Sequence, residues 1–188
     1  GPKGSGLVAE LGLTEQVHFI TASLAKTFAA RAGIVLCAES VANWFPYVSH
    51  PAIFSSALLP YEIAGLNATL DVIIASDDRR YKLHHKSKYL RNELLKREIY
   101  VSSKSQIVSL EGGKEEITEE IRDELEARNI FGSVFCAPAT PKNRSLLRFS
   151  ITSTVTKDQL DKILSACDDF GEALGIIHKP KLKAVGGY

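Results

Sequence analysis

The sequence has few cysteines, no long apolar run and no excess of charge of either sign. Its 188 residues contain three cysteines, Cys37, Cys136 and Cys167. The number is odd, and the wide spacing matches neither a disulfide framework nor a metal-ligand motif. We therefore expect three reduced thiols in a cytoplasmic protein.

The even balance of charge argues against two classes of partner. The 23 basic and 22 acidic residues give a net charge of +1, so we expect no general attraction to nucleic acid or to an anionic membrane. No apolar run is long enough to span a bilayer, and no signal-peptide pattern opens the chain. His84 and His85 stand in a basic stretch without a partner at ligand spacing, which predicts a solvated helix face rather than a metal site.

The first part of the chain alternates short apolar segments with helical patterns. Residues 17–21 and 33–37 have the length and composition of strands, and the lack of alternation in the second predicts burial on both faces. A short helix ended by Pro46 is expected over residues 40–47, and an irregular loop from His50 to Pro60. Helical patterns then cover residues 61–74 and 80–96, with a bend at Asp77–Asp78.

From residue 99 the pattern becomes α+β. Thr156 and Gln159 have the spacing of a capping box at the start of the last helix. The expected strands are 107–110, 133–136 and 145–152, and the expected helices are 117–129 and 156–174. Such an order predicts a small sheet with helices on one face. We therefore predict three regions, at residues 1–78, 79–178 and 179–188, the last of these a tail.

One lysine has unusual neighbours. Lys26 follows a predicted strand in the run Ala22-Ser-Leu-Ala-Lys-Thr-Phe, where small and apolar residues predict that its side chain is shielded from water. Burying an ammonium is costly, and desolvation favours the neutral amine, which can form a Schiff base with an aldehyde. The alternative is a lysine whose stem lies along apolar surface while its ammonium stays in water.

Two further motifs follow Lys26 along the chain. One is Ile53-Phe-Ser-Ser-Ala-Leu-Leu-Pro, and the other joins Ala137-Pro-Ala-Thr-Pro to Leu147-Arg-Phe-Ser-Ile-Thr. Together the three resemble motifs of the α-oxoamine synthases, which use pyridoxal phosphate to join an amino acid to an acyl-CoA. The resemblance covers nearly the whole chain. It implies an α/β fold, the C-terminal part of a fold type I pyridoxal phosphate-dependent transferase, with the end of the large-domain sheet and a small α+β domain.

The resemblance also implies roles for five residues. Lys26 would hold pyridoxal phosphate as an internal aldimine and then act as the proton-transfer base, and Arg148 would bind the carboxylate of the amino acid. Ser23, Ser55 and Ser56 would meet the cofactor phosphate. In the family, the loop that matches Ser55 and Ser56 reaches into the neighbouring subunit, which implies a homodimer.

Each of these residues also has an ordinary structural interpretation. Ser23 suits a strand end where its hydroxyl satisfies backbone groups, and Ser55 and Ser56 suit a helix cap. Arg148 lies in an alternating strand, where a structural ion pair with a neighbouring acidic residue is the alternative to substrate binding.

Departures from the family pattern point to one branch. Ala29 replaces the glycine that the family has three residues after the lysine, and Ala32-Gly33 replaces Gly-Gly. These features are similar to the cholera-type quorum-sensing autoinducer synthases. That branch condenses an aminobutyrate-like or S-adenosylmethionine-like amine with a medium-chain acyl-CoA to give an α-aminoketone. The alternatives are a sibling synthase that uses glycine, alanine or serine, and a non-catalytic C-terminal fragment or dimerisation domain.

The start of the chain bears on how complete the site is. Residues 1–6 suit either a linker or the glycine-rich segment that, in the family, follows an Asp-Glu-Ala/Ser-His motif. The aspartate of that motif, which pairs with the cofactor's pyridinium nitrogen, has no counterpart here. We therefore expect the C-terminal part, roughly half, of a longer enzyme.

Overall fold

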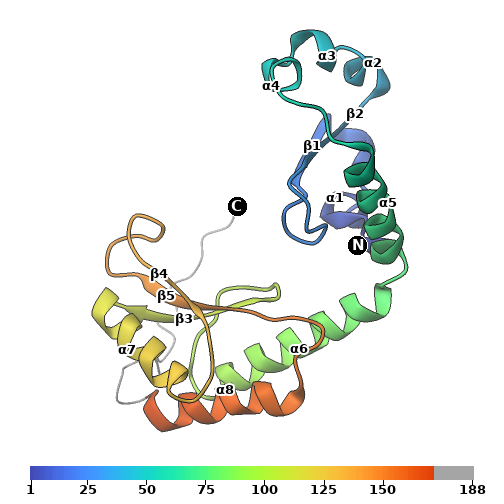
Figure 1. Cartoon of the computed structure of the whole chain (residues 1–188). Helices are drawn as coiled ribbons and strands as arrows, with labels where there is room; N and C mark the ends of the chain where they lie inside the picture. The colour runs from blue at the N-terminus through green and yellow to red at the C-terminus, as the bar shows by residue number, and fades with distance from the viewer. Residues whose placement is uncertain (172–188) are drawn as a thin grey trace. The chain divides into compact units, whose positions relative to one another are not determined.

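The computed structural model describes residues 1–171 (Figure 1). The predicted tail at 179–188 and the predicted end of the last helix near Leu174 lie outside the described residues. The chain divides into two compact units, Gly1–Asp77 and Asp78–Tyr188.

The first unit contains a two-stranded antiparallel sheet. Strands β1 (Phe19–Ser23) and β2 (Gly33–Cys37) pair from Phe19 opposite Cys37 to Ser23 opposite Gly33, so that residues 24–32 form the connecting loop. Short helical segments surround this hairpin along the chain, and the longest comes last. They are η1 (Pro2–Gly4), α1 (Gly6–Glu10), η2 (Thr14–Gln16), α2 (Glu39–Ala42), α3 (Phe45–Val48), α4 (His50–Ile53) and α5 (Pro60–Ile74).

Prolines open helices in this unit rather than end them. Pro60 is the first residue of α5, and the carboxylate of Glu62 accepts a hydrogen bond from the Leu59 amide at 2.7 Å. The expectation that Pro46 ends a helix is wrong, because Pro46 lies in the first turn of α3. The segment from His50 to Pro60 is not irregular throughout, since α4 forms with a proline in its first turn. A proline is tolerated there because the first-turn amides have no partner within the helix.

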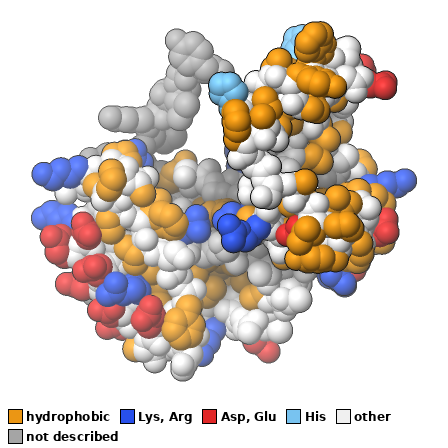
Figure 2. Space-filling view, turned by 45° about the horizontal axis from the view of Figure 1, so that its top comes forward, with side chains coloured by type: hydrophobic (Ala, Val, Ile, Leu, Met, Phe, Trp, Pro, Cys, Tyr) orange, Lys and Arg blue, Asp and Glu red, His pale blue; other side chains and the backbone are white. Residues whose placement is uncertain are grey.

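The first unit has almost no buried core. Leu24, at 7% exposure, is its one buried hydrophobic side chain. All the exposed large hydrophobic side chains of the described residues lie in this unit except Tyr81, Leu95, Tyr100 and Phe131, and Figure 2 shows such side chains as orange patches on the surface. The expectation that β2 is buried on both faces is wrong for this chain, because four of its five residues are exposed and a two-stranded sheet alone supplies no layer to cover them.

The second unit is a three-stranded antiparallel sheet with helices. Its strands are β3 (Ile107–Gly113), β4 (Ser133–Phe135) and β5 (Ser145–Ser150), and their order is β3-β5-β4. Its helices are α6 (Asp77–Lys96), α7 (Glu115–Glu126) and α8 (Lys157–Phe170). The predicted bend at Asp77–Asp78 is the start of α6. Figure 1 shows α7 and α8 on one face of the sheet, as the sequence pattern predicts.

The core of the second unit lies between that face and the helices. Successive side chains of a strand point to opposite faces, so Leu147 and Phe149 of β5 enter the core while Arg148 between them does not. Helices α6, α7 and α8 supply much of the rest of the core, together with Val108 and Leu110 of β3. The fully buried members from the helices include Leu90 and Leu94 from α6, Ile121 and Leu125 from α7, and Leu160 and Cys167 from α8.

Polar contacts join the ends of α6 and α8. The Arg97 guanidinium donates to both carboxylate oxygens of Asp168, at 2.7 and 3.1 Å. Nearer the middle of α6, the Tyr89 hydroxyl donates to Asp161 at 2.5 Å, and the Lys157 amine lies 2.5 Å from the other oxygen of that carboxylate. The hydrogen bonds from Lys157 and Tyr89 lower the pKa of Asp161. These contacts fix the register of α8 along α6.

Two adjacent glycines close β3 for different reasons. A Cβ atom on Gly112 would lie 3.0 Å from the Thr118 Cα atom and 3.1 Å from the Ile121 Cδ1 atom, so α7 packs directly on the bare backbone. A Cβ atom on Gly113 would have space, with the Asn143 carbonyl oxygen 3.8 Å away, but its φ is +78°. The first position requires a small residue, and the second requires a left-handed backbone.

Candidate functional site

Lys26 lies in the loop between β1 and β2, and backbone hydrogen bonds close this loop. The Leu24 amide donates to the Ala32 carbonyl at 2.9 Å, and the Ala30 amide donates back to the Leu24 carbonyl at 3.0 Å. The Ala29 amide donates to the Lys26 carbonyl at 3.0 Å. The buried side chain of Leu24 anchors this turn, so the sequence around Lys26 specifies a tight loop rather than an open one.

Ala29 has a left-handed backbone, with φ +51°. A residue with a Cβ atom is strained there by roughly 1–2 kcal/mol, whereas glycine adopts this conformation freely. This is the position at which the α-oxoamine synthase motif has glycine. The departure noted in the sequence therefore has a structural meaning, because the loop keeps a conformation that suits glycine while carrying alanine.

The side chain of Lys26 is exposed. The expectation that Lys26 is shielded from water is wrong for this chain, because the elements beside its loop leave it uncovered. Among the described residues, no hydrogen bond or ion pair involves its amine. The amine is therefore accessible to an electrophile, and the described residues of the first unit do not enclose it.

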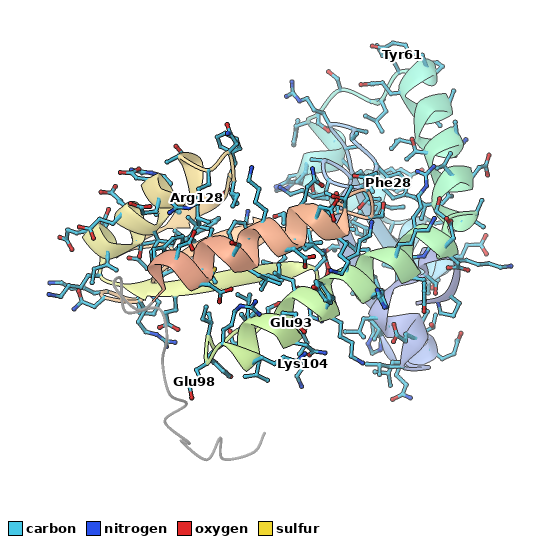
Figure 3. The ribbon with its side chains drawn as sticks, turned by 90° about the horizontal axis from the view of Figure 1, so that it is seen from below. Phe28, Tyr61, Glu93, Glu98, Lys104 and Arg128 are labelled. Carbon is cyan, nitrogen blue, oxygen red and sulfur yellow. The ribbon has the colours of Figure 1, made fainter. Side chains whose placement is uncertain are left out.

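A groove lies beside the loop, between residues 28–32 and the start of α5. Its volume is about 520 Å³, and its walls include Phe28, Leu58 and Leu66 with Glu62 and Arg31. Figure 3 labels Phe28, which belongs to this loop. The groove adjoins the side of the loop that follows Lys26, and Lys26 itself is not part of its wall.

The three candidate serines differ in what their hydroxyls can offer a phosphate. The Ser23 oxygen accepts a hydrogen bond from the Ala25 amide at 3.3 Å, which leaves its own O–H free to donate. The Ser55 hydroxyl donates to the Pro51 carbonyl at 2.5 Å, so its proton is already used. Neither Ser55 nor Ser56 caps α5, since the N-cap residue is Leu59. Ser23 and Lys26 lie in one hairpin, whereas Ser55 and Ser56 lie in the loop before α5.

Arg148 belongs to the second unit, in the middle of the central strand β5. Its cross-strand neighbours are Ser109 on β3 and Ser133 on β4, and neither is charged. The Arg148 Nε atom is buried and has no hydrogen-bond partner. In the part of the chain that the structure describes, no acidic side chain pairs with Arg148, so the alternative of a structural ion pair is not what the structure shows.

Arg144 differs from Arg148 in this respect. Its Nε atom lies 3.1 Å from the Glu111 carboxylate, and that hydrogen bond raises the pKa of Arg144. The pair borders a cavity of about 190 Å³ whose walls also include Ser109 and Leu146. Arg144 is thus neutralised by Glu111, whereas no acidic side chain of the described residues neutralises Arg148.

The sequence did not indicate one neighbour of Arg148, which is Phe135. The guanidinium carbon of Arg148 lies over the ring of Phe135, 4.2 Å from its centroid. Phe135 is identifiable in the sequence only as part of a strand. Its contact with Arg148 depends on the register of β4 against β5, which no local pattern reports.

Other kinds of site are not found in the described residues. Among residues 1–171, no group of three or more His, Cys, Asp or Glu side chains could hold a metal ion. His84 and His85 are exposed on α6. In the same part of the chain, no helix combines the length and apolar character needed to cross a membrane.

Comparison with known proteins identifies the family. The model of aminotransferase class I and II matches residues 4–166. The chain belongs to this family.

Individual relatives show which members of that family the chain resembles. The chain is 53% identical over 169 residues to the CAI-1 autoinducer synthase of Vibrio campbellii (strain ATCC BAA-1116), covering 90% of this chain and 43% of that protein. It is 26% identical over 178 residues to the 8-amino-7-oxononanoate synthase of Petrotoga mobilis (strain DSM 10674 / SJ95), covering 94% of this chain and 45% of that protein. The resemblance to the α-oxoamine synthases is thereby confirmed. The chain spans less than half the length of these relatives.

A solved structure confirms the fold. The chain superposes on SPT with a PLP internal aldimine with a TM-score of 0.85 at 23% identity, covering 94% of this chain and 45% of that one. At this identity the likeness establishes the fold, which is part of a fold type I enzyme as predicted. The predicted cofactor, pyridoxal phosphate, is confirmed at the level of the family.

Proposed function

We propose that this chain is part of a pyridoxal phosphate-dependent acyltransferase of the autoinducer-synthase branch. The enzyme would condense an aminobutyrate-like or S-adenosylmethionine-like amine with a medium-chain acyl-CoA to give an α-aminoketone signal. The observation that carries this proposal is the 53% identity with the CAI-1 autoinducer synthase over 90% of the chain. We further propose that it works as a cytoplasmic homodimer, with Ser55 and Ser56 contributing to the neighbouring subunit's site.

The loop between β1 and β2 fits the cofactor. The Lys26 amine is exposed and has no partner among the described residues, so it is open to attack an aldehyde, and the Ser23 hydroxyl keeps a proton for a phosphate oxygen. Lys26 would hold the cofactor covalently, while Ser23 of the same subunit and Ser56 of the neighbouring subunit would donate to the cofactor phosphate. Pyridoxal phosphate would supply the electron sink for chemistry at the amine's α-carbon. The Lys26 Nζ atom would then take the proton from that carbon.

Arg148 would bind the carboxylate of the amine substrate. A planar guanidinium matches a carboxylate in a bidentate arrangement. No acidic side chain of the described residues pairs with Arg148. A substrate carboxylate therefore does not have to displace one in order to bind the guanidinium. Ser109 and Ser133 flank Arg148 on the neighbouring strands and add neutral polar surface.

The first test is the visible absorption that a lysine-bound pyridoxal phosphate gives. The intact enzyme should absorb in the visible, and Lys26→Ala should abolish this absorption. Lys104→Ala, which removes another exposed lysine, should leave it unchanged. A colourless intact enzyme, or colour that survives Lys26→Ala, would contradict the assignment.

The second test separates the substrate assignments. The intact enzyme should be assayed with L-2-aminobutyrate, S-adenosylmethionine, glycine, alanine and serine, each against a series of acyl-CoA chain lengths. The 26% identity with an 8-amino-7-oxononanoate synthase supports the sibling alternative, so a preference for glycine, alanine or serine would replace the autoinducer assignment. The exposure of Lys26 supports the other alternative, that the 188 residues alone do not form a closed catalytic site. Colour in the intact enzyme but not in the 188-residue chain would agree with that alternative.

A further inference from the structure

Arg148 and Phe135 share the face of the second unit's sheet that lies opposite the helices. Leu147 and Phe149 of β5 point into the core, so Arg148 between them lies on the other face. Phe135 on β4 pairs with Leu146 of β5, and Ser133 pairs with Arg148. Phe135 therefore lies diagonally across from Arg148 on one face of the sheet, within reach of a long side chain.

Within residues 1–171, no hydrogen bond or ion pair holds the Arg148 guanidinium, which instead contacts the ring of Phe135. The guanidinium carbon lies 4.2 Å from the ring centroid, well within the distance of a cation–π contact. The Nε atom of Arg148 is buried without a hydrogen bond. The group is thus held by its contact with the ring and by packing, and not by an acidic side chain of the described residues.

This way of holding an arginine has a chemical advantage for a binding site. An aspartate or glutamate would fix the guanidinium, but it would occupy the N–H groups that a substrate carboxylate needs. A ring that contacts the flat face of the guanidinium leaves the N–H groups at its edge free. Arg144, four residues earlier in the chain, shows the contrasting arrangement, because its Nε atom is paired with the Glu111 carboxylate.

We propose that Phe135 is the positioning residue for Arg148, contacting its guanidinium through the ring so that N–H groups stay free for the substrate carboxylate. This inference rests on the proposed function, because it assigns no role to Phe135 unless Arg148 binds a carboxylate. Phe135 itself would touch neither the cofactor nor the reacting atoms.

The test compares two substitutions in the intact enzyme. Phe135→Leu keeps an apolar side chain but removes the ring, and Phe135→Tyr keeps the ring. Binding would be followed by the change in visible absorption of the cofactor when L-2-aminobutyrate is added, and in parallel with propylamine, which is the same amine without the carboxylate. We expect Phe135→Leu to weaken L-2-aminobutyrate binding about 5- to 30-fold, to leave propylamine binding unchanged, and to raise KM for the amine more than it lowers kcat. Phe135→Tyr should restore binding to within about threefold of the unsubstituted enzyme.

A double substitution shows whether the two residues act together. In the Arg148→Ala background, Phe135→Leu should cause no further loss of L-2-aminobutyrate binding. Equal weakening of L-2-aminobutyrate and propylamine, or a full additional loss in that background, would show a merely structural effect and overturn the inference.

Failure of the inference and failure of the proposed function give different results. If Arg148→Ala weakens L-2-aminobutyrate binding while Phe135→Leu does not, the positioning role is refuted and the proposed function stands. If Arg148→Ala also has no effect, the carboxylate role of Arg148 in the proposed function fails, and the inference fails with it.

Discussion

The two adjacent glycines at the end of β3 allow a prediction in which the same substitution destabilises the second unit for two different reasons. Gly112→Ala places a Cβ atom against the backbone of Thr118 in α7, at 3.0 Å from its Cα atom. Gly113→Ala meets no such obstacle, because the nearest atom is 3.8 Å away, but it forces alanine to φ +78°. Both variants should destabilise the second unit.

The expected magnitudes follow from these two causes. Overpacking at Gly112 should cost about 1–3 kcal/mol, because the atoms that must move belong to a helix that contributes Ile121 and Leu125 to the core. The left-handed backbone at Gly113 should cost roughly 1–2 kcal/mol for alanine. Asparagine separates the causes, since it tolerates the left-handed region but is larger than alanine. Gly113→Asn should therefore be less destabilising than Gly113→Ala, whereas Gly112→Asn should be more destabilising than Gly112→Ala.

The assay is urea unfolding of the polypeptide 78–188 followed by far-UV circular dichroism. This unit holds all the buried hydrophobic side chains of the described residues except Leu24, so we expect it to unfold cooperatively. A change of 1 kcal/mol should move the urea midpoint by about 0.3–1 M for a small domain. Amide hydrogen exchange in β3 and α7 of the intact enzyme gives the same order of stabilities. If asparagine had the same effect relative to alanine at both positions, overpacking at Gly112 and a left-handed backbone at Gly113 would not be the separate causes, and the reasoning would be refuted.

Three further predictions concern a loop, a thiol and a helix cap. Ala29→Gly should slow hydrogen exchange of the Leu24 and Ala30 amides, because relief of about 1–2 kcal/mol of backbone strain exceeds the roughly 0.5–1 kcal/mol that glycine adds in chain entropy; faster exchange would refute the strain. Burial raises the pKa of Cys167 to about 12, so at pH 8 iodoacetamide should modify this thiol only after unfolding. Because an unfolded cysteine ionises near pH 8.5, the contribution of the buried thiol to stability should be fully present below that pH and should fall as pH rises toward 12. Thr156→Ala removes the hydroxyl that accepts from the Gln159 amide at 3.2 Å, and the free energy of unfolding measured in urea should fall by about 1 kcal/mol.

Local patterns in the sequence predicted those features whose causes are local. The capping box of Thr156 and Gln159 is present at the start of α8, and the apolar run 33–37 forms β2 within the predicted bounds. The helix α5 begins at Pro60 and ends at Ile74, close to the predicted 61–74. Each depends on residues within a few positions of one another.

Features that depend on distant parts of a chain could not be predicted. A continuous apolar run shows that a strand tends to be buried, but not that the same 188 residues supply the cover, and β2 is exposed for this reason. The exposure of Lys26 has the same origin. The contact of Phe135 with Arg148 joins positions on two strands through their register, and a short β4 of three residues gives little sequence signal for that register.

The state of Arg148 also has a consequence for how the enzyme should be handled. A guanidinium that no acidic side chain of residues 1–171 neutralises attracts any small planar anion, and not only a substrate. Acetate and formate, which carry the same carboxylate group, should therefore act as competitors of the amine substrate, and buffers that contain them would make the enzyme seem to bind that substrate more weakly than it does.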